Sequence, residues 1–238
     1  MKLNKFSLVL ASIVVLCFFI FMLLNIKVST RQGINYEWHN ISMPLYLKLI
    51  DFFDRHYNYQ ELVKRIIKGK KTDQERVLRL FEWTHENIKK VPYAFPIIDD
   101  HVWNIIVRGY GTNDQSSDVF TTLCNYAGID AFFTFVQSED FTKRIPLSFV
   151  KLEKKWYVFD PYNGVYFKNK DQYFASIEQI KNGNWRRFFI SEENRRDYDY
   201  SEYFKNLSSI GNIGLKRANI QSPLRRFMFE VKKLVNNN

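Results

Sequence analysis

Cysteine and histidine, the side chains most often used as nucleophiles, bases and metal ligands, are scarce in this sequence of 238 residues. Its two cysteines lie far apart and one falls in an apolar N-terminal run, so we expect no disulfide within the domain. The histidines show none of the short spacings typical of metal sites, and we expect neither a metal nor another cofactor. These residues are Cys17, Cys124, His39, His56, His85 and His101.

Cys124 is the thiol of the domain that could act as a nucleophile. It lies three turns into an expected helix, on the same stripe as Val119, Phe120 and Leu123. A thiol on such an apolar stripe is expected to be buried, and burial raises its pKa because the thiolate loses its hydration. We therefore predict a structural role for Cys124.

A hydroxyl nucleophile is the second option, with Ser116 or Ser117 paired to His101 as the base. Serines near a helix start are ordinary capping residues, which favours the simpler interpretation. His85 lies on the apolar face of another expected helix. There we expect a core histidine with one satisfied hydrogen bond, and a site residue is the alternative.

Four sequence fragments occur in an order that resembles the core of transglutaminase-like proteins, which have a papain-related thiol fold. They are GYGTNDQ at 109–115, LCNYAGI at 123–129, LSF at 147–149 and WYVFDP at 156–161. The resemblance covers about residues 73–165. It implies an α+β fold in which a helix with the active site at its N-terminus packs on an antiparallel sheet.

The family uses a catalytic cysteine, histidine and aspartate, and the resemblance assigns a position to each. A thiolate is stabilised at a helix N-terminus, a histidine on a neighbouring strand moves the proton, and an aspartate orients the imidazole. Asn113 stands at the cysteine position and Leu147 at the histidine position, whereas Asp160 matches the aspartate. Asn113 is also a good N-cap residue, so the helix could still start there without a nucleophile.

The loss of the catalytic pair does not depend on how the sequences are aligned. No cysteine occurs between Lys27 and Leu123, and no histidine follows His101. We therefore predict a degenerate site and lean against an enzyme. The alternative is an active hydrolase or acyltransferase with a relocated nucleophile. Beyond the three degenerate positions, four residues are candidates for lining the cleft: Asp114, His101, Trp156 and Tyr157.

Local patterns predict the elements that would position this site. The capping box Thr72–Glu75 begins a helix that stops before Pro92, and Gly128 ends the helix that carries Cys124. Strands are expected at 131–136, 147–152 and 156–160. The predicted organisation is a short tail (1–5), an anchor (6–26), a linker (27–42), a helical region packed on the domain (43–72), the core (73–165), and an aromatic and basic extension (166–238).

Residues 6–26 form an uncharged apolar run that is long enough to cross the roughly 30 Å hydrocarbon layer of a membrane. A cleaved signal peptide is the competing interpretation, but the run is long for one and no A-x-A-like cleavage site follows it. Positive charges on both sides decide orientation weakly. From the very short N-terminal tail we expect a single-pass protein with its domain on the non-cytoplasmic side.

The formal net charge of +10 and the aromatic C-terminal region limit the partners. A basic surface can face anionic lipid or acidic glycans, and we expect no nucleic-acid binding because no zinc-finger, RNP or helix-turn-helix signature occurs. Residues 223–234 form an amphipathic basic helix, either docked on the domain or lying on anionic lipid. By its resemblance to transglutaminase-like proteins, the expected function is a non-catalytic binding or scaffolding module at the cell envelope, in a setting such as polysaccharide assembly, with an envelope glycan or a protein as partner.

Overall fold

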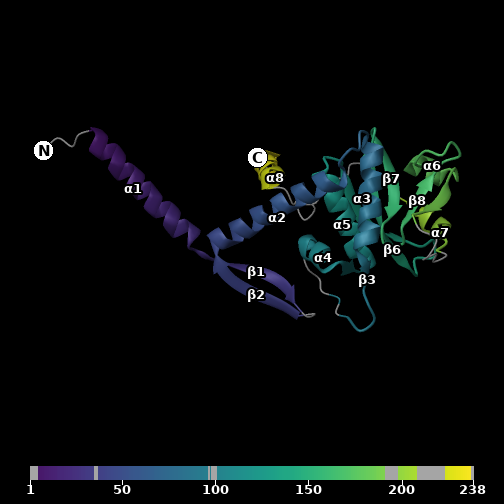
Figure 1. The fold of residues 1–238 in the computed structure, drawn as a ribbon, viewed down its shortest axis with the longest axis horizontal. Helices are drawn as coiled ribbons and strands as arrows, with labels where there is room; N and C mark the ends of the chain where they lie inside the picture. The colour runs from purple at the N-terminus through teal and green to yellow at the C-terminus, as the bar shows by residue number, and fades with distance from the viewer. Residues whose placement is uncertain are drawn as a thin grey trace.

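The computed structural model describes residues 5–34, 37–95, 97, 101–190, 198–207 and 223–236. An apolar helix, a β-hairpin and a second long helix lead to a domain in which helices cover a sheet (Figure 1). The helix α1 (Lys5–Leu24) confirms the predicted N-terminal helix and is long and apolar enough to cross a membrane. None of its described side chains is buried.

The segment expected to be a linker, 27–42, forms an antiparallel hairpin instead. Its strands are β1 (Lys27–Ile34) and β2 (Glu37–Pro44), and Val28 lies opposite Met43 in their register. The amide of Leu45 donates to the carbonyl of Ile26 at 2.9 Å and closes the base of the hairpin. The β-branched residues of this short segment favour strands, which a prediction based on its position between two helices did not take into account.

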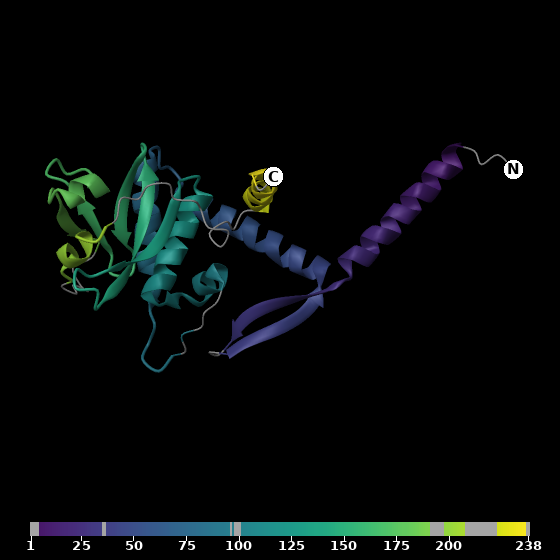
Figure 2. The ribbon, with the colours of Figure 1, turned by 180° about the vertical axis from the view of Figure 1, so that it is seen from behind.

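The helix α2 (Leu45–Ile66) is present as expected, but only its C-terminal part packs on the domain. Tyr59, Val63 and Ile66 are buried, whereas Leu49 and Phe53 are exposed. The prediction that this whole apolar stretch packs on the domain was therefore wrong. The reason is geometric, because α2 extends beyond the helices that it contacts (Figures 1 and 2).

Three helices form one layer of the domain, and the last of them is the expected active-site helix. They are α3 (Asp73–Asn87), α4 (Val102–Arg108) and α5 (Asn113–Tyr126). The capping box of Thr72 and Glu75 is confirmed, and so is the left-handed Gly128 after α5, at φ +84°. Thr112, rather than Asn113, is the N-cap of α5, and its amide donates to the Gln115 side chain at 3.1 Å.

The sheet of the domain has five antiparallel strands in the order β5-β6-β7-β8-β9. The three predicted strands are confirmed as the first three of them. The boundary expected at residue 165 falls at the start of β8, so the supposed extension supplies two strands of the same sheet. The strands are β5 (Ala131–Gln137), β6 (Arg144–Leu152), β7 (Lys155–Asp160), β8 (Val165–Lys168) and β9 (Arg186–Phe189).

Short elements complete the described part of the chain. A parallel pair joins β3 (Lys89–Lys90) to β4 (Tyr110–Gly111) just before α5. Beyond the sheet strands lie α6 (Ile177–Lys181), α7 (Tyr200–Phe204) and α8 (Pro223–Asn236). The helix α8 confirms the predicted C-terminal helix and lies beside α2 (Figures 1 and 2).

Helices cover both faces of the sheet, so the domain has two apolar layers. On one face Phe159 of β7 packs against Phe81 of α3 and Phe120 of α5, with ring centroids 5.3 and 5.4 Å apart. On the other face Phe167 of β8 packs against Tyr200 of α7 at 5.1 Å. Because successive side chains of a strand point to opposite faces, each strand residue belongs to one of these layers.

Candidate functional site

The strands β6 and β7 place side by side two of the three positions that the resemblance assigns to catalytic residues. Ser148 pairs with Phe159, and the antiparallel register therefore places Leu147 opposite Asp160. Their side chains share the sheet face that α6 and α7 cover, and Leu147 packs in the apolar layer of that face. Leu147 is 0% exposed and Asp160 is 1% exposed. Both positions thus lie in the protein interior.

The carboxylate of Asp160 accepts three hydrogen bonds from two residues on its own side of the sheet. The backbone amide of Asn163 donates to Oδ1 at 3.1 Å, and the Asn163 side-chain amide donates to Oδ2 at 2.8 Å. The hydroxyl of Tyr200, which arrives from α7, also donates to Oδ2 at 2.8 Å. A buried carboxylate is tolerated only when such donors replace its hydration, so this network is what allows Asp160 to be buried.

Burial raises the pKa of the Asp160 carboxyl above its ordinary value. The hydrogen bonds from Asn163 and Tyr200, and then the nearby His85, act in the opposite direction and offset part of that effect. The pKa of the Tyr200 hydroxyl is also raised. The main cause is the burial of the side chain, and the second is the adjacent Asp160 carboxylate. Tyr200 is therefore the donor in this contact, and Asp160 the acceptor.

His85 reaches this region from α3, but it contacts backbone rather than a nucleophile. Its Nδ1 lies 3.0 Å from the carbonyl oxygen of Pro161, which confirms the expected hydrogen bond, although the side chain is half-buried rather than part of the core. Its ring lies against Gly164, where a Cβ would come within 2.8 Å of Nε2. His85 thus packs on the turn that follows β7 and supports the turn that holds Asp160.

Asn113 begins α5 as its first helical residue, and α5 packs on the sheet face opposite to the one that Leu147 shares with Asp160. The structure confirms the expected order of helix and strands. Among the described residues, Asn113 Oδ1 and the hydroxyl of Ser148, which points to the α5 face, are buried without a hydrogen-bond partner.

The other candidate nucleophiles lie within α5 and are buried. Cys124 packs in the apolar layer between α5 and the sheet, and burial raises the pKa of its thiol, as expected. Ser116 and Ser117 are buried in the same helix. His101 is the N-cap residue of the separate helix α4. Asp114, in the first turn of α5, accepts a hydrogen bond from the hydroxyl of Thr112.

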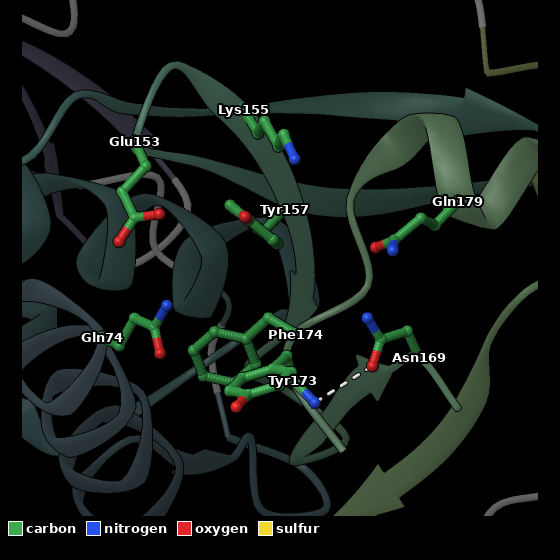
Figure 3. Close-up of a pocket in the computed structure, with 8 residues that line it drawn as sticks. All are labelled: Gln74, Glu153, Lys155, Tyr157, Asn169, Tyr173, Phe174 and Gln179. Atoms are coloured by element: carbon green, nitrogen blue, oxygen red, sulfur yellow. Dashed lines mark hydrogen bonds between the residues drawn. The ribbon is translucent and has the colours of Figure 1, made fainter. Parts of the chain in front are cut away.

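A pocket of about 310 Å³ opens at the other end of β7. It lies where the turn between β6 and β7 meets the segment between β8 and α6 (Figure 3). Since a strand rises about 3.3 Å per residue, the start of β7 at the pocket and Asp160 at its end are about 16 Å apart. The lining residues are Gln74, Glu153, Lys155, Tyr157, Asn169, Tyr173, Phe174 and Gln179.

Tyr157 is the one predicted cleft residue in this lining. Trp156, which was also expected to line the cleft, points to the other face of the sheet and packs edge-on against the ring of Phe132. The remaining lining residues were not anticipated, because they come from four separate segments. The polar pattern of the segment 169–173 was the available signal, since asparagine and aspartate there are typical of a turn.

The pocket combines aromatic rings with amide side chains. Phe174 anchors one wall through ring contacts with Tyr157 and Phe159, at 6.1 and 5.4 Å. Asn169 Oδ1 accepts from the backbone amides of Asp171 and Tyr173, and Gln179 Oε1 accepts from Ser176. These bonds fix the two amides and leave their NH₂ groups without a partner among the described residues (Figure 3).

Two loops of the pocket hold non-glycine residues in the left-handed region of the backbone map. Glu153 and Lys154 form the turn between β6 and β7 at φ +48° and +68°, and Gln172 precedes Tyr173 at φ +68°. Such conformations cost on the order of 1 kcal/mol each and are found where neighbouring structure enforces them, often at binding sites. Within the described ranges, no group of three His, Cys, Asp or Glu side chains is placed to hold a metal ion.

Comparisons with known proteins give one family match. Residues 60–161 match the family model of the transglutaminase-like superfamily, whereas no curated protein matches the sequence. The similar solved structures include a proposed cysteine protease from Cytophaga hutchinsonii, with 14% identity and a TM-score of 0.40 over 60% of this chain and 51% of that one.

Two further structures are similar at 12% identity. One is a proposed protease from Parabacteroides distasonis, with a TM-score of 0.37 over 55% of this chain and 35% of its own. The other is described as a TGase, with a TM-score of 0.35 over 56% and 43%. This chain therefore spans about half or less of the length of the solved structures that it matches.

Proposed function

We propose that this chain, whose residues 60–161 are a transglutaminase-like domain, is a membrane-anchored, non-catalytic binding module at the cell envelope. One observation carries the non-catalytic part: the histidine position holds Leu147, which is fully buried beside an Asp160 whose oxygens are taken by Asn163 and Tyr200. A leucine carries no proton, and the nearby imidazole of His85 bonds to the carbonyl oxygen of Pro161 rather than to Asp160.

The placement of Asp160 supports a structural role for the retained aspartate. An acid or base must lie within hydrogen-bond reach of a substrate proton, and a residue that is 1% exposed beneath α7 offers no such approach. Asp160 instead joins the turn after β7 to α7 through Asn163 and Tyr200. The family aspartate is thus kept as a cross-link of the fold.

The anchor is α1, which has the length and composition of a single membrane span. Fixed by this helix, the domain stays near a membrane surface, where it would meet lipids and envelope glycans rather than dilute soluble ligands. Polysaccharide assembly on the non-cytoplasmic side is the proposed setting, in keeping with the resemblance to transglutaminase-like proteins.

The pocket beside β7 is the proposed binding site, and a saccharide is its proposed ligand class. Sugar rings have apolar CH faces that stack on aromatic side chains and hydroxyls that accept from amide NH₂ groups. Tyr157 and Tyr173 supply rings, and Asn169 and Gln179 supply amides. At about 310 Å³ the pocket is at the small end of ligand sites, which suits one or two sugar rings.

The non-catalytic role predicts that the purified full-length protein does not turn over glutamine-containing peptides, amines or esters. Reaction progress by mass spectrometry should match that of a buffer blank. Sustained turnover that is lost in Asp160→Ala and kept in Cys124→Ser would overturn this role. Ser116→Ala, Ser117→Ala and Ser148→Ala would then identify a relocated hydroxyl nucleophile, which is the second candidate function.

The binding role predicts that Tyr173→Ala weakens retention of the full-length protein on immobilised envelope polysaccharide by about tenfold, from the loss of a stacking face of about 1–1.5 kcal/mol. Tyr93→Ala is the matched control, because Tyr93 is fully exposed and lies outside the pocket. Equal retention of both variants and wild type would place the ligand elsewhere. No retention of any of them would remove the glycan from the proposal.

A further inference from the structure

The helix α8 is amphipathic, and its apolar stripe is not covered by the domain. Phe227, Met228, Leu234 and Val235 recur at helical spacing and are all exposed, Leu234 at 69%. A stripe of this size costs free energy in water and marks an interaction surface. The helix also contacts α2.

The helix α2 carries a second exposed apolar stripe in the part that extends away from the domain. Its residues follow a spacing of four, three and four, so they lie along one face of the helix. Ile50 is 61% exposed and Tyr57 is 65% exposed. The stripe consists of Tyr46, Ile50, Phe53 and Tyr57.

The helix α2 begins where the apolar run of α1 ends, and α8 lies beside α2. The hairpin joins α1 directly to α2, and the amide of Leu45, the first residue of α2, bonds to Ile26 at the end of the apolar run. Figures 1 and 2 show α2 leaving this junction in a different direction from α1. They also show α8 on the same side of α2 as α1, with the hairpin on the other side.

The charges of α8 indicate which kind of surface would cover it. The sequence of α8 contains four basic residues and one acidic residue, and the described side chains of Lys232 and Lys233 are exposed. A helix with an apolar stripe flanked by lysine and arginine is typical of segments that lie in the interface of an anionic membrane. A second copy of the chain would bring the same positive charges together instead.

We propose that α8 and the exposed part of α2 form an interfacial surface that lies on the anionic lipid of the membrane that α1 crosses. This inference rests on the membrane attachment of the proposed function and adds a contact that orients the domain. Once α1 holds the chain, the two stripes need no strong affinity of their own, because anchoring makes their contact with lipid intramolecular. The domain then has a fixed tilt relative to the membrane instead of free rotation on α1.

The experiment places an environment-sensitive fluorophore on one introduced cysteine at a time in the full-length chain, in a Cys17→Ser background in which the remaining Cys124 is buried. Leu234→Cys reports on α8 and Ile50→Cys reports on α2, while Tyr93→Cys is the control on the domain. Each labelled chain is mixed with liposomes of phosphatidylcholine alone or with phosphatidylglycerol, floated on a gradient, and probed with lipids that carry a quencher in the acyl chain.

The expected result is a blue-shifted emission that lipid quenches at Leu234 and Ile50 and not at Tyr93. The shift at Leu234 should be larger with phosphatidylglycerol, and it should be reduced by high salt or by Lys232→Glu with Lys233→Glu. A chain that floats while both probes remain in water overturns the interfacial surface and leaves the anchor. A chain that does not float overturns both. A blue shift without lipid quenching, in a particle of doubled mass, assigns the stripes to a second copy and also overturns the proposal.

Discussion

Replacing Asp160 by alanine should lower the free energy of unfolding by about 3–5 kcal/mol, because it leaves several buried donors without an acceptor. The hydroxyl of Tyr200 and both amide groups of Asn163 would lose their partner inside the domain. Urea denaturation of the full-length protein in detergent, followed by near-UV circular dichroism, measures this change. The tyrosine and tryptophan bands do not report on the apolar helix α1, because it contains neither residue.

Two conservative variants test whether the hydrogen-bond network is the cause. Asp160→Asn keeps one acceptor oxygen, so it should cost less, about 1–2 kcal/mol. Tyr200→Phe removes one donor and leaves the carboxylate with both bonds from Asn163, which should also cost about 1–2 kcal/mol. If Asp160→Ala is as stable as wild type, the carboxylate is not a cross-link, and the argument for a structural aspartate fails.

The raised pKa of Asp160 adds a pH dependence to the same comparison. Because the pKa is higher in the folded protein than the ordinary 3.8, the folded state binds this proton more tightly. The contribution of Asp160 to stability is therefore fully present below pH 3.8 and is lost as the pH rises through the folded-state pKa. The advantage of wild type over Asp160→Asn should accordingly be larger at low pH than at neutral pH.

Replacing Gly164 by alanine should destabilise the fold by about 2–5 kcal/mol for two separate reasons. The φ angle of +64° is unfavourable for a residue with a Cβ, at about 1–2 kcal/mol. The new methyl group would also lie 2.8 and 2.9 Å from ring atoms of His85, and overpacking of this kind costs about 1–3 kcal/mol. The ring cannot easily move away, because its Nδ1 is bonded to Pro161.

Gly183→Ala is the matched control for this prediction. Gly183 also has a left-handed backbone, at φ +70°, but nothing lies within 4 Å of the position that its Cβ would take. It should therefore show only the backbone cost of about 1–2 kcal/mol. In the double variant His85→Ala with Gly164→Ala, the clash should be absent, so the two effects should not add. Additive effects, or equal losses for the two glycines, would show that His85 does not hold this turn.

The secondary structure of the core could be predicted because it depends on local signals. The capping residues Thr72 and Glu75 begin α3, and Gly128 ends α5 with a left-handed backbone. The apolar stripe that contains Leu123 and Cys124 predicted which face of α5 is buried. Each of these features is set by residues within a few positions along the chain, which is the range in which sequence patterns determine structure.

The hairpin and the extent of the sheet could not be predicted in the same way. Residues 27–44 have weak alternation, and their pairing is defined by the partner strand rather than by the segment alone. The strands β8 and β9 are short, and the aromatic residues of the C-terminal region gave no clear period. Their place beside β7 depends on contacts between residues distant in sequence.

The sequence by itself determined that no cysteine and no histidine stand at the positions that the resemblance assigns to them. A chain with no cysteine between Lys27 and Leu123 and no histidine after His101 cannot supply the family's Cys-then-His order, whatever its fold. It also determined the apolar run of α1, because a membrane span depends on length and composition alone. These conclusions concern residue types, which folding does not change.

Only the tertiary structure decided what the remaining residues do. The sequence predicts that Asp160 is a catalytic aspartate. In the structure its carboxylate is buried beneath α7 and accepts a hydrogen bond from Tyr200, which lies 40 residues away in the sequence. Tyr157 joins a pocket with side chains from four separate segments. The stripe of α2 is exposed because the helix extends past its neighbours. Hydrogen-bond partners, burial and pocket walls are set by three-dimensional contacts between distant residues, and those contacts give these side chains their roles.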